Sequence, residues 1–241
     1  ITHQRSFVDY THAKTFCPVQ NSQKLTMIEK RYKDAFERAS DERKEKILQV
    51  GIEEFSSKGY ENANINIIAK NSGISIGLMY KYFSTKEDLF ITCVQRGMQI
   101  LDEAVDEILN SNDKLLVKAE KLIRTTCKHS RKNASYIKLY NEIASDKGSK
   151  MVKTLAYEIE SGTSKKYIKA ITSALAVGDV RQDLDPRMFA FFLDNLLTSL
   201  QFSYSCDYYR ERFQIYTGVN IDEMDDEQIV IQLLKFIESA F

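Results

Sequence analysis

The stretch from Ile65 to Phe90 constrains the fold of this chain more than any other part of it. Its first apolar residues recur at helical spacing, and Asn64 just before them is a good N-cap. The Asn-Ser-Gly sequence at residues 71–73 breaks this helix, and Ser75 can cap a second one. Two short helices around a tight turn predict a helix-turn-helix, a motif whose second helix enters the major groove of DNA.

Further residues in and around this stretch occur at regular intervals that form a recognisable motif. They are Ile68, Ala69 and Gly73, then Ser75, Gly77, Tyr80, Tyr82 and Phe83, then Lys86, Glu87 and Leu89, with Ile47, Phe55, Gly59 and Tyr60 upstream. The pattern resembles the signature of TetR-like (TetR/AcrR) transcriptional regulators and covers roughly 45 to 50 residues. The rest of the chain resembles that family only in its helical pattern.

The resemblance implies an all-α fold, with an N-terminal helix-turn-helix DNA-binding head of three helices and a C-terminal helical bundle for ligand binding and dimerisation. We expect an extension with a possible extra helix over residues 1–40, the head over residues 41–87, and a body for effector binding and dimerisation over residues 88–241. The implied function is that of a homodimeric repressor, which binds an inverted-repeat operator through the helix around residues 75–82 and is released by a small-molecule effector. The choice of repressor over activator rests on the resemblance alone.

By position within the resemblance, a set of residues in the head faces DNA. The set is Asn64, Ser75, Ile76, Gly77, Leu78, Tyr80, Lys81, Tyr82 and Lys86. The tyrosine hydroxyls and the lysines would contact phosphate, whereas the apolar Ile76 and Leu78 would meet thymine methyl groups. Met79 and Phe83 are interpreted as core. The alternative, in which the tyrosines only pack as amphipathic side chains, stays open.

The composition favours a helical protein without a bulk electrostatic attraction to nucleic acid. The 241 residues are 43% hydrophobic, enough for a sizeable core, and include only 2 prolines and 9 glycines, which favours long helices. Lys plus Arg and Asp plus Glu both total 34, so binding to DNA requires a local patch. No apolar run approaches the roughly 18 residues of a membrane span, and we expect a cytoplasmic protein that does not enter membranes.

The N-terminal arm and the cysteines predict no metal site. Residues 1–24 are polar and aperiodic, as in a flexible arm or in sequence upstream of a native start at Met27. His3, His12 and Cys17 match no standard ligand spacing, and the 4 cysteines of the chain contain no C-x-x-C pair. We therefore predict neither a metal nor a cofactor, and reduced thiols.

The segment from Met27 to Ala39 predicts an extra helix ahead of the head, because charged residues surround a few apolar ones. Lys30, Arg31 and Lys33 in it either contact phosphate or form a solvated charged face. Further helices are predicted over residues 41–58, 86–110, 115–130, 136–144, 149–177, 187–216 and 226–241.

A cavity between the body helices is predicted from aromatic residues that interrupt the aliphatic stripes. Its expected lining is Cys127, Tyr136, Tyr140, Tyr157, Tyr167, Phe189, Phe192 and Phe202, which suits an aromatic or amphipathic molecule. A filled aromatic core is the open alternative. The last helices are apolar on more than one flank, and a dimer interface is predicted at Leu193, Leu196, Leu197, Leu200, Ile229, Leu233, Leu234 and Ile237.

Two other classes of protein were weighed. An enzyme is disfavoured because His129 is the only histidine outside the arm, Cys127 points elsewhere on a predicted helix, and no phosphate-binding glycine loop occurs. The second class is a helical adaptor whose helix-turn-helix does not bind DNA. The combination of serine, glycine, tyrosine and lysine in the motif argues against it, since a helical hairpin does not require that combination. Salt-dependent DNA binding would separate the two.

Overall fold

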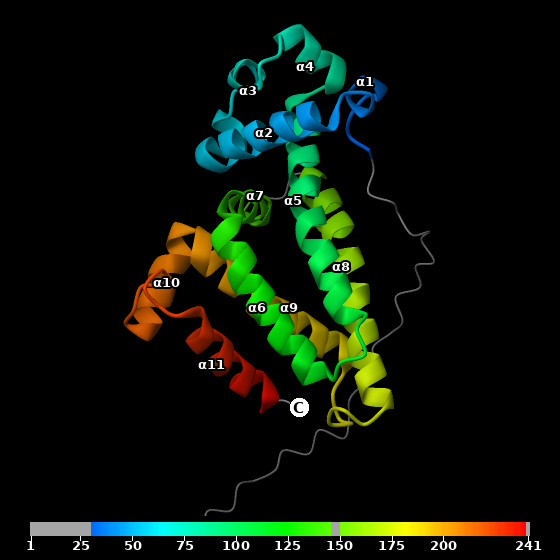
Figure 1. The fold of residues 1–241 in the computed structure, drawn as a ribbon, viewed down its shortest axis with the longest axis vertical. Helices are drawn as coiled ribbons and strands as arrows, with labels where there is room; N and C mark the ends of the chain where they lie inside the picture. The colour runs from blue at the N-terminus through cyan, green and yellow to red at the C-terminus, as the bar shows by residue number, and fades with distance from the viewer. Residues whose placement is uncertain (1–29, 146–149, 240–241) are drawn as a thin grey trace, which may run out of the picture.

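The computed structural model describes residues 30–145 and 150–239, and the regular structure in these residues is entirely α-helical. The predicted all-α fold is confirmed. Figure 1 shows an elongated molecule in which helices α1 to α4 gather at one end and helices α5 to α11 make up the rest. Helix α5 (Lys86–Leu109) runs from the head into the body, so it links the two parts covalently.

The head consists of α2 (Asp41–Asn62), α3 (Ile65–Asn71) and α4 (Ile76–Tyr82). Each of these helices begins at a side-chain cap, as the sequence predicts. The capping oxygens belong to Ser40, Asn64 and Ser75, and they accept hydrogen bonds from the backbone N–H groups of Arg43, Asn66 and Leu78. Helix α2 is interrupted at Gly59, where φ is 73°, a left-handed conformation that favours glycine.

The predicted helix over residues 27–39 is wrong in its length. Only α1 (Asp34–Glu37) forms, and residues 27–29 lie outside the described part of the chain. No side chain caps the start of α1, and Ser40 already has the extended backbone that begins α2. The segment is held instead by tertiary contacts, because Phe36 is buried among aromatic rings of the head.

The body contains α6 (Leu115–Lys132), α7 (Ala134–Ser145), α8 (Lys150–Ala176), α9 (Pro186–Ser205), α10 (Asp207–Thr217) and α11 (Asp226–Glu238). The prediction of one continuous helix over residues 187–216 is wrong, since the backbone is extended at Cys206. Beyond this break Arg210 donates to the carbonyl of Tyr204 at 2.7 Å, and the ring of Tyr209 packs 5.0 Å from that of Phe202. These contacts bring α10 back against the end of α9.

The head and the body share a hydrophobic core. Buried side chains of α2, α3, α4 and α5 form one cluster with Leu139 and Ile143 from α7 and with Leu155 and Ile159 from α8. Helix α7 packs directly against α2. A displacement of α7 or α8 is therefore transmitted to the head through packed side chains as well as through α5.

Five of the eight residues predicted for the dimer interface are buried inside the monomer, which corrects the prediction for those five. Leu193, Leu197, Leu200, Ile229 and Ile237 are buried in the body core, and Leu196, Leu233 and Leu234 are partly buried against it. Both α9 and α11 pack against α6, and this arrangement covers the leucine stripes.

No helix in the described residues combines the length and the hydrophobicity needed to cross a membrane.

Candidate functional site

The outer surface of α4 at the end of the molecule carries most of the residues predicted to face DNA. Ile76, Gly77, Tyr80 and Lys81 are all exposed there, and 47% of the Tyr80 surface is accessible. The opposite face is core, because Met79 and Phe83 are fully buried, as predicted. The exposed face thus offers a hydroxyl, an ammonium group and an apolar side chain to one ligand.

Tyr82 of the predicted set lies in the core, which is a correction, and Leu78 is only partly accessible. Tyr82 is only 4% exposed, and its ring packs edge to face against Phe36 at 5.4 Å. Leu78 is half-buried and packs against the head core. The apolar part of the exposed face therefore reduces to Ile76, and Tyr82 supports the helix from behind.

The remaining predicted residues hold the motif together. Asn64 and Ser75 are exposed, and their side-chain oxygens cap α3 and α4. Lys86 donates from Nζ to the carbonyl of Glu61 at 2.9 Å, and the same ammonium group lies 5.0 Å from the centre of the Tyr60 ring. Lys86 thereby fixes the last residues of α2 to the start of α5.

The extension supports the end of α4, which the sequence reasoning missed. The Lys33 backbone N–H donates to the carbonyl of Tyr82 at 2.9 Å, and its Nζ donates to the carbonyl of Tyr80 at 2.9 Å. These carbonyls are in the last turn of α4, where a cation is favourable. Lys30 pairs with Asp34 and Glu37. The sequence left two roles open for Lys33, contact with phosphate or exposure on a solvated charged face. Its hydrogen bonds to α4 fit neither role.

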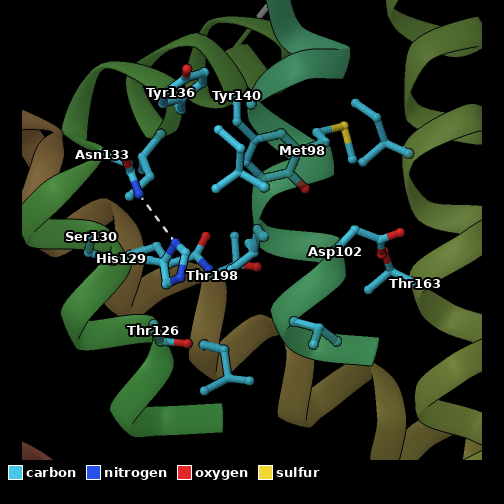
Figure 2. A pocket seen from close by; sticks show the side chains of 18 of the residues that line it. Met98, Asp102, Thr126, His129, Ser130, Asn133, Tyr136, Tyr140, Thr163 and Thr198 are labelled. Atoms are coloured by element: carbon cyan, nitrogen blue, oxygen red, sulfur yellow. Dashed lines mark hydrogen bonds between the residues drawn. The ribbon is translucent and has the colours of Figure 1, made fainter. Parts of the chain in front are cut away.

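A second candidate site is a cavity of about 140 Å³ in the body, which is partly open and is lined by residues of α5, α6, α7, α8 and α9. Figure 2 shows Met98 and Asp102 entering from α5, Thr126 and His129 from α6, Tyr140 from α7, and Thr163 and Thr198 from α8 and α9. Most of the wall is apolar, with hydroxyl and carboxylate groups among the carbon atoms. Such a mixture is typical of small-molecule sites.

The structure brings three of the predicted lining residues to this cavity, namely Tyr136, Tyr140 and Tyr167. The other five are corrections. Cys127 is buried in the body core, Phe189 packs against that core, and Phe202 packs behind Tyr140 at 5.7 Å. Tyr157 and Phe192 are exposed at the surface. Helical periodicity cannot separate these positions, because each is apolar and only the packing of neighbouring helices decides which side is covered.

The polar residues that line the cavity were not predicted, because the predicted lining was chosen from aromatic residues. Tyr140 donates its hydroxyl hydrogen to Glu160 Oε1 at 2.6 Å. Asn133 Nδ2 lies 3.2 Å from His129 Nδ1, as the dashed line in Figure 2 shows, and a donating amide leaves the imidazole proton on Nε2. Burial, and then the charges of two nearby lysines, lower the pKa of His129 below its usual range.

The carboxylates of the cavity differ in their partners. Asp102 pairs at 2.7 Å with Lys166, which also pairs with Asp106 at 2.8 Å. Burial, and then the charge of Glu160, raise the pKa of Asp194 to about 6. Burial, and then the charge of Asp194, raise the pKa of Tyr167. Asp194, Glu160 and Tyr167 all line the cavity, so the charge of Asp194 lies close to both of the other groups.

The described residues contain no group of three or more metal-ligating side chains. Cys93, Cys127 and Cys206 are buried free thiols, and burial raises the pKa of Cys93. His3, His12 and Cys17 of the predicted arm lie outside the described residues. The two candidate sites are consequently the exposed face of α4 and the body cavity.

The sequence of the head matches a known family. Residues 47–93 match the family model of the bacterial regulatory proteins of the tetR family. The fatty acid metabolism regulator protein of Bacillus subtilis is 24% identical over 144 residues, which are 59% of this chain and 73% of the relative. An HTH-type transcriptional regulator of Staphylococcus aureus is 36% identical over 59 residues, which are 24% of this chain and 32% of the relative. The match thus covers about a third of that regulator's length.

The fold is similar to that of solved structures. The crystal structure of FadR from Bacillus subtilis in complex with stearoyl-CoA superposes with a TM-score of 0.65 at 16% identity, over 82% of this chain and 98% of that one. At this identity the similarity establishes the fold.

Proposed function

Because this chain belongs to the tetR family of bacterial regulatory proteins, a family of transcriptional regulators and not of enzymes, we propose that it is a homodimeric repressor. It binds an inverted-repeat operator through α4, and a small molecule in the body cavity releases it from DNA. The proposal keeps the division into an extension over residues 1–40, a head over residues 41–87 and a body over residues 88–241. Its site of action is the cytoplasm, where the operator DNA lies.

The observation that carries the proposal is the exposed face of α4 at one end of the molecule. A short helix capped by Ser75, with Gly77 in its first turn, lets the backbone approach a groove closely. Tyr80 and Lys81 supply donors for phosphate, and Ile76 supplies an apolar contact for a thymine methyl group. Ile67 and Lys70, exposed on α3, extend the same surface.

Homodimerisation is supported by apolar surface on the outer sides of α9 and α11. Phe191 and Phe192 on α9 are 59% and 54% exposed, and Phe236 on α11 is 62% exposed. Met188 and Ile231 on the same two helices are also exposed. Large apolar side chains exposed on α9 and α11, which both pack against α6, are typical of a surface that a second copy covers. A two-fold dimer places two copies of α4 on the two halves of an inverted repeat.

Release by an effector is supported by the position of the cavity. Its wall includes α5, which starts beside α4, and α7, which packs on α2. A ligand that separates α5 from α7 changes the angle between head and body. A ligand acts as an inducer only if it binds one of these arrangements more tightly than the other.

The test of DNA binding is fluorescence anisotropy of the purified full chain on the DNA upstream of its own gene, compared with scrambled DNA, over a series of salt concentrations. We expect specific binding that weakens as salt rises. A variant with both Tyr80→Ala and Lys81→Ala loses specific binding, and the slope against salt falls by about one, because Lys81 is the one cation that the variant removes. Lys58→Ala, an exposed lysine at the far end of α2, is the matched control and keeps wild-type affinity.

Equal and weak binding to both DNAs, unchanged in the double variant, would contradict the proposal. That result favours the adaptor interpretation, in which the helix-turn-helix contacts a protein. A third result is that the chain prefers the upstream DNA and the double variant binds it as tightly as wild type. In that case the surface that recognises the DNA sequence is not on α4.

A further inference from the structure

We propose that the cavity takes a small organic cation with an apolar body, whose ammonium group binds between Asp194 and Glu160. The inference rests on the proposed function, since it names the chemical class of the effector for the same cavity. It is carried by the charges, the unpartnered groups and the size of the cavity.

The ionisable lining of the cavity is predominantly acidic. It contains Asp102, Glu160, Asp194 and His129, and neither lysine nor arginine occurs among the lining residues described. The charge of Asp102 is balanced by Lys166. The carboxylates of Glu160 on α8 and Asp194 on α9 remain without a basic partner in the described part of the chain. A cation is the ligand that this arrangement lacks.

The surroundings of Asp194 point to the same conclusion. Within the described residues no hydrogen bond or ion pair reaches its carboxylate, although the group is largely buried. Glu160 accepts a hydrogen bond from Tyr140, and its charge disfavours ionisation of Asp194. Both carboxylates are partly buried and line the same cavity, where two negative charges are unfavourable unless a positive charge lies between them. A bound ammonium group supplies that charge and donates to both.

An unpartnered hydroxyl is an independent sign of a ligand. Ser130 lines the cavity and is 1% exposed, and its hydroxyl has no hydrogen-bond partner in the described structure. A buried polar group without a partner costs free energy, and a polar atom of a bound molecule can supply the missing partner. His129, the residue that precedes Ser130 on α6, points into the cavity in Figure 2 and offers a second polar contact.

The rest of the wall fits a compact apolar body. The rings of Tyr136, Tyr140 and Tyr167, with Met98 and Leu101, provide apolar surface, and tyrosine faces also attract cations. The cavity volume of about 140 Å³ is close to that of an engineered protein cavity of roughly 150 Å³ that binds benzene. A single ring or a chain of similar size fits it.

The acyl-CoA class is disfavoured for this cavity. Stearoyl-CoA, the ligand in the related FadR crystal, carries phosphate groups and a long acyl chain. No lysine or arginine in the described lining would neutralise those phosphates, and Asp194 and Glu160 would repel them. The volume of about 140 Å³ is also too small for such a molecule.

The experiment is isothermal titration calorimetry of the full chain without DNA, near neutral pH. The probes are benzylamine, the neutral benzyl alcohol, the anionic benzoate, and octanoyl-CoA. We expect benzylamine to bind at least about tenfold more tightly than benzyl alcohol, because a charged hydrogen bond replaces a neutral one, and benzoate and octanoyl-CoA to bind more weakly still. This comparison uses the wild-type chain, so it does not depend on the folding of a variant.

Variants then assign the preference to the two carboxylates. Asp194→Asn and Glu160→Gln each reduce the preference for benzylamine over benzyl alcohol to about twofold or less, while binding of benzyl alcohol persists. Asp183→Asn removes an exposed carboxylate outside the cavity and retains the full preference. Circular dichroism confirms that each variant folds.

The inference is overturned if benzoate or octanoyl-CoA binds at least as tightly as benzylamine, or if benzylamine does not bind at millimolar concentration. It is also overturned if Asp194→Asn and Glu160→Gln, both folded, keep the wild-type preference. Because calorimetry is done without DNA, its failure leaves the proposed repressor function intact when the operator binds specifically. Loss of operator binding with a retained preference for benzylamine contradicts the repressor function alone.

Discussion

At the scale of single residues, Tyr80 and Tyr82 show how two positions of one motif divide between surface and core. They are separated by one residue on α4, so their side chains point about 200° apart around the helix. Tyr80 is exposed, whereas Tyr82 contacts Phe36 of the extension. The motif alone assigned both hydroxyls to DNA, because it contains no information about the extension that covers one of them.

Removing each hydroxyl in turn distinguishes the two roles. Tyr80→Phe is expected to weaken operator binding by about threefold to tenfold, the effect of one lost hydrogen bond. Tyr82→Phe keeps the buried ring and is expected to leave affinity within about twofold. Anisotropy titrations at one salt concentration measure both. Equal losses in the two variants would return Tyr82 to the DNA-facing set.

Asp194 makes stability depend on pH. Its pKa is about 6 in the folded protein against 3.8 as the ordinary value, so between these values the folded state binds more protons than the unfolded state. The free energy of unfolding therefore falls as pH rises through this interval. Asp194→Asn removes that loss, and its gain in stability over wild type is expected to be larger at about pH 7.5 than at about pH 4, by up to about 2 kcal/mol.

Urea denaturation of both proteins at the two pH values checks this expectation. Asp183→Asn is the matched control. Its carboxyl is exposed beside Arg181, which lowers its pKa, so this variant shows no gain at the higher pH. A gain for Asp194→Asn that is equal at both pH values would show that burial does not perturb this carboxyl.

At the scale of helices, the contact between α5 and α7 depends on a glycine. A Cβ atom built on Gly97 would lie 2.2 Å from Cδ1 of Tyr136, far inside van der Waals contact. Both residues line the cavity. The absence of a side chain at Gly97 therefore allows the Tyr136 ring to lie directly on α5, at the joint between the cavity and the helix that enters the head.

Gly97→Ala is expected to lower the free energy of unfolding by about 1–3 kcal/mol, because the added methyl group overpacks the contact. In a Tyr136→Ala background the same substitution should cost less than about 1 kcal/mol, since the obstructing ring is gone. Urea denaturation of the four proteins gives the coupling directly. A penalty of the same size in both backgrounds would mean that the cost is not caused by Tyr136.

At the scale of the whole molecule, the apolar residues of the last helices separate into a covered and an uncovered set. The leucines predicted for the interface complete the core of the monomer. The phenylalanines at 191, 192 and 236 remain exposed. In the proposed two-fold dimer a second copy of the chain covers these phenylalanines. A test of dimerisation therefore substitutes the phenylalanines and not the leucines.

The double variant Phe191→Glu and Phe192→Glu is expected to convert a dimer into a monomer, because two charges at the centre of an apolar interface cannot be desolvated without partners. Light scattering coupled to size-exclusion chromatography measures the mass. Val177→Glu, at an apolar residue just after α8 that is more exposed than either phenylalanine, is the control and stays dimeric. A dimer that survives the double variant excludes this surface of α9 from the interface.

Local sequence patterns are sufficient to predict the helices of the head and their caps. Capping and helical periodicity act between residues a few positions apart, so Ser40, Asn64, Ser75 and Thr85 mark helix starts without knowledge of the fold. The tertiary structure alone decided which apolar residues are core, cavity wall or free surface, and that Lys33 supports α4. These outcomes depend on contacts between segments distant in the chain. Many apolar and polar residues have the same local pattern, and only the packing of one helix on another distinguishes them.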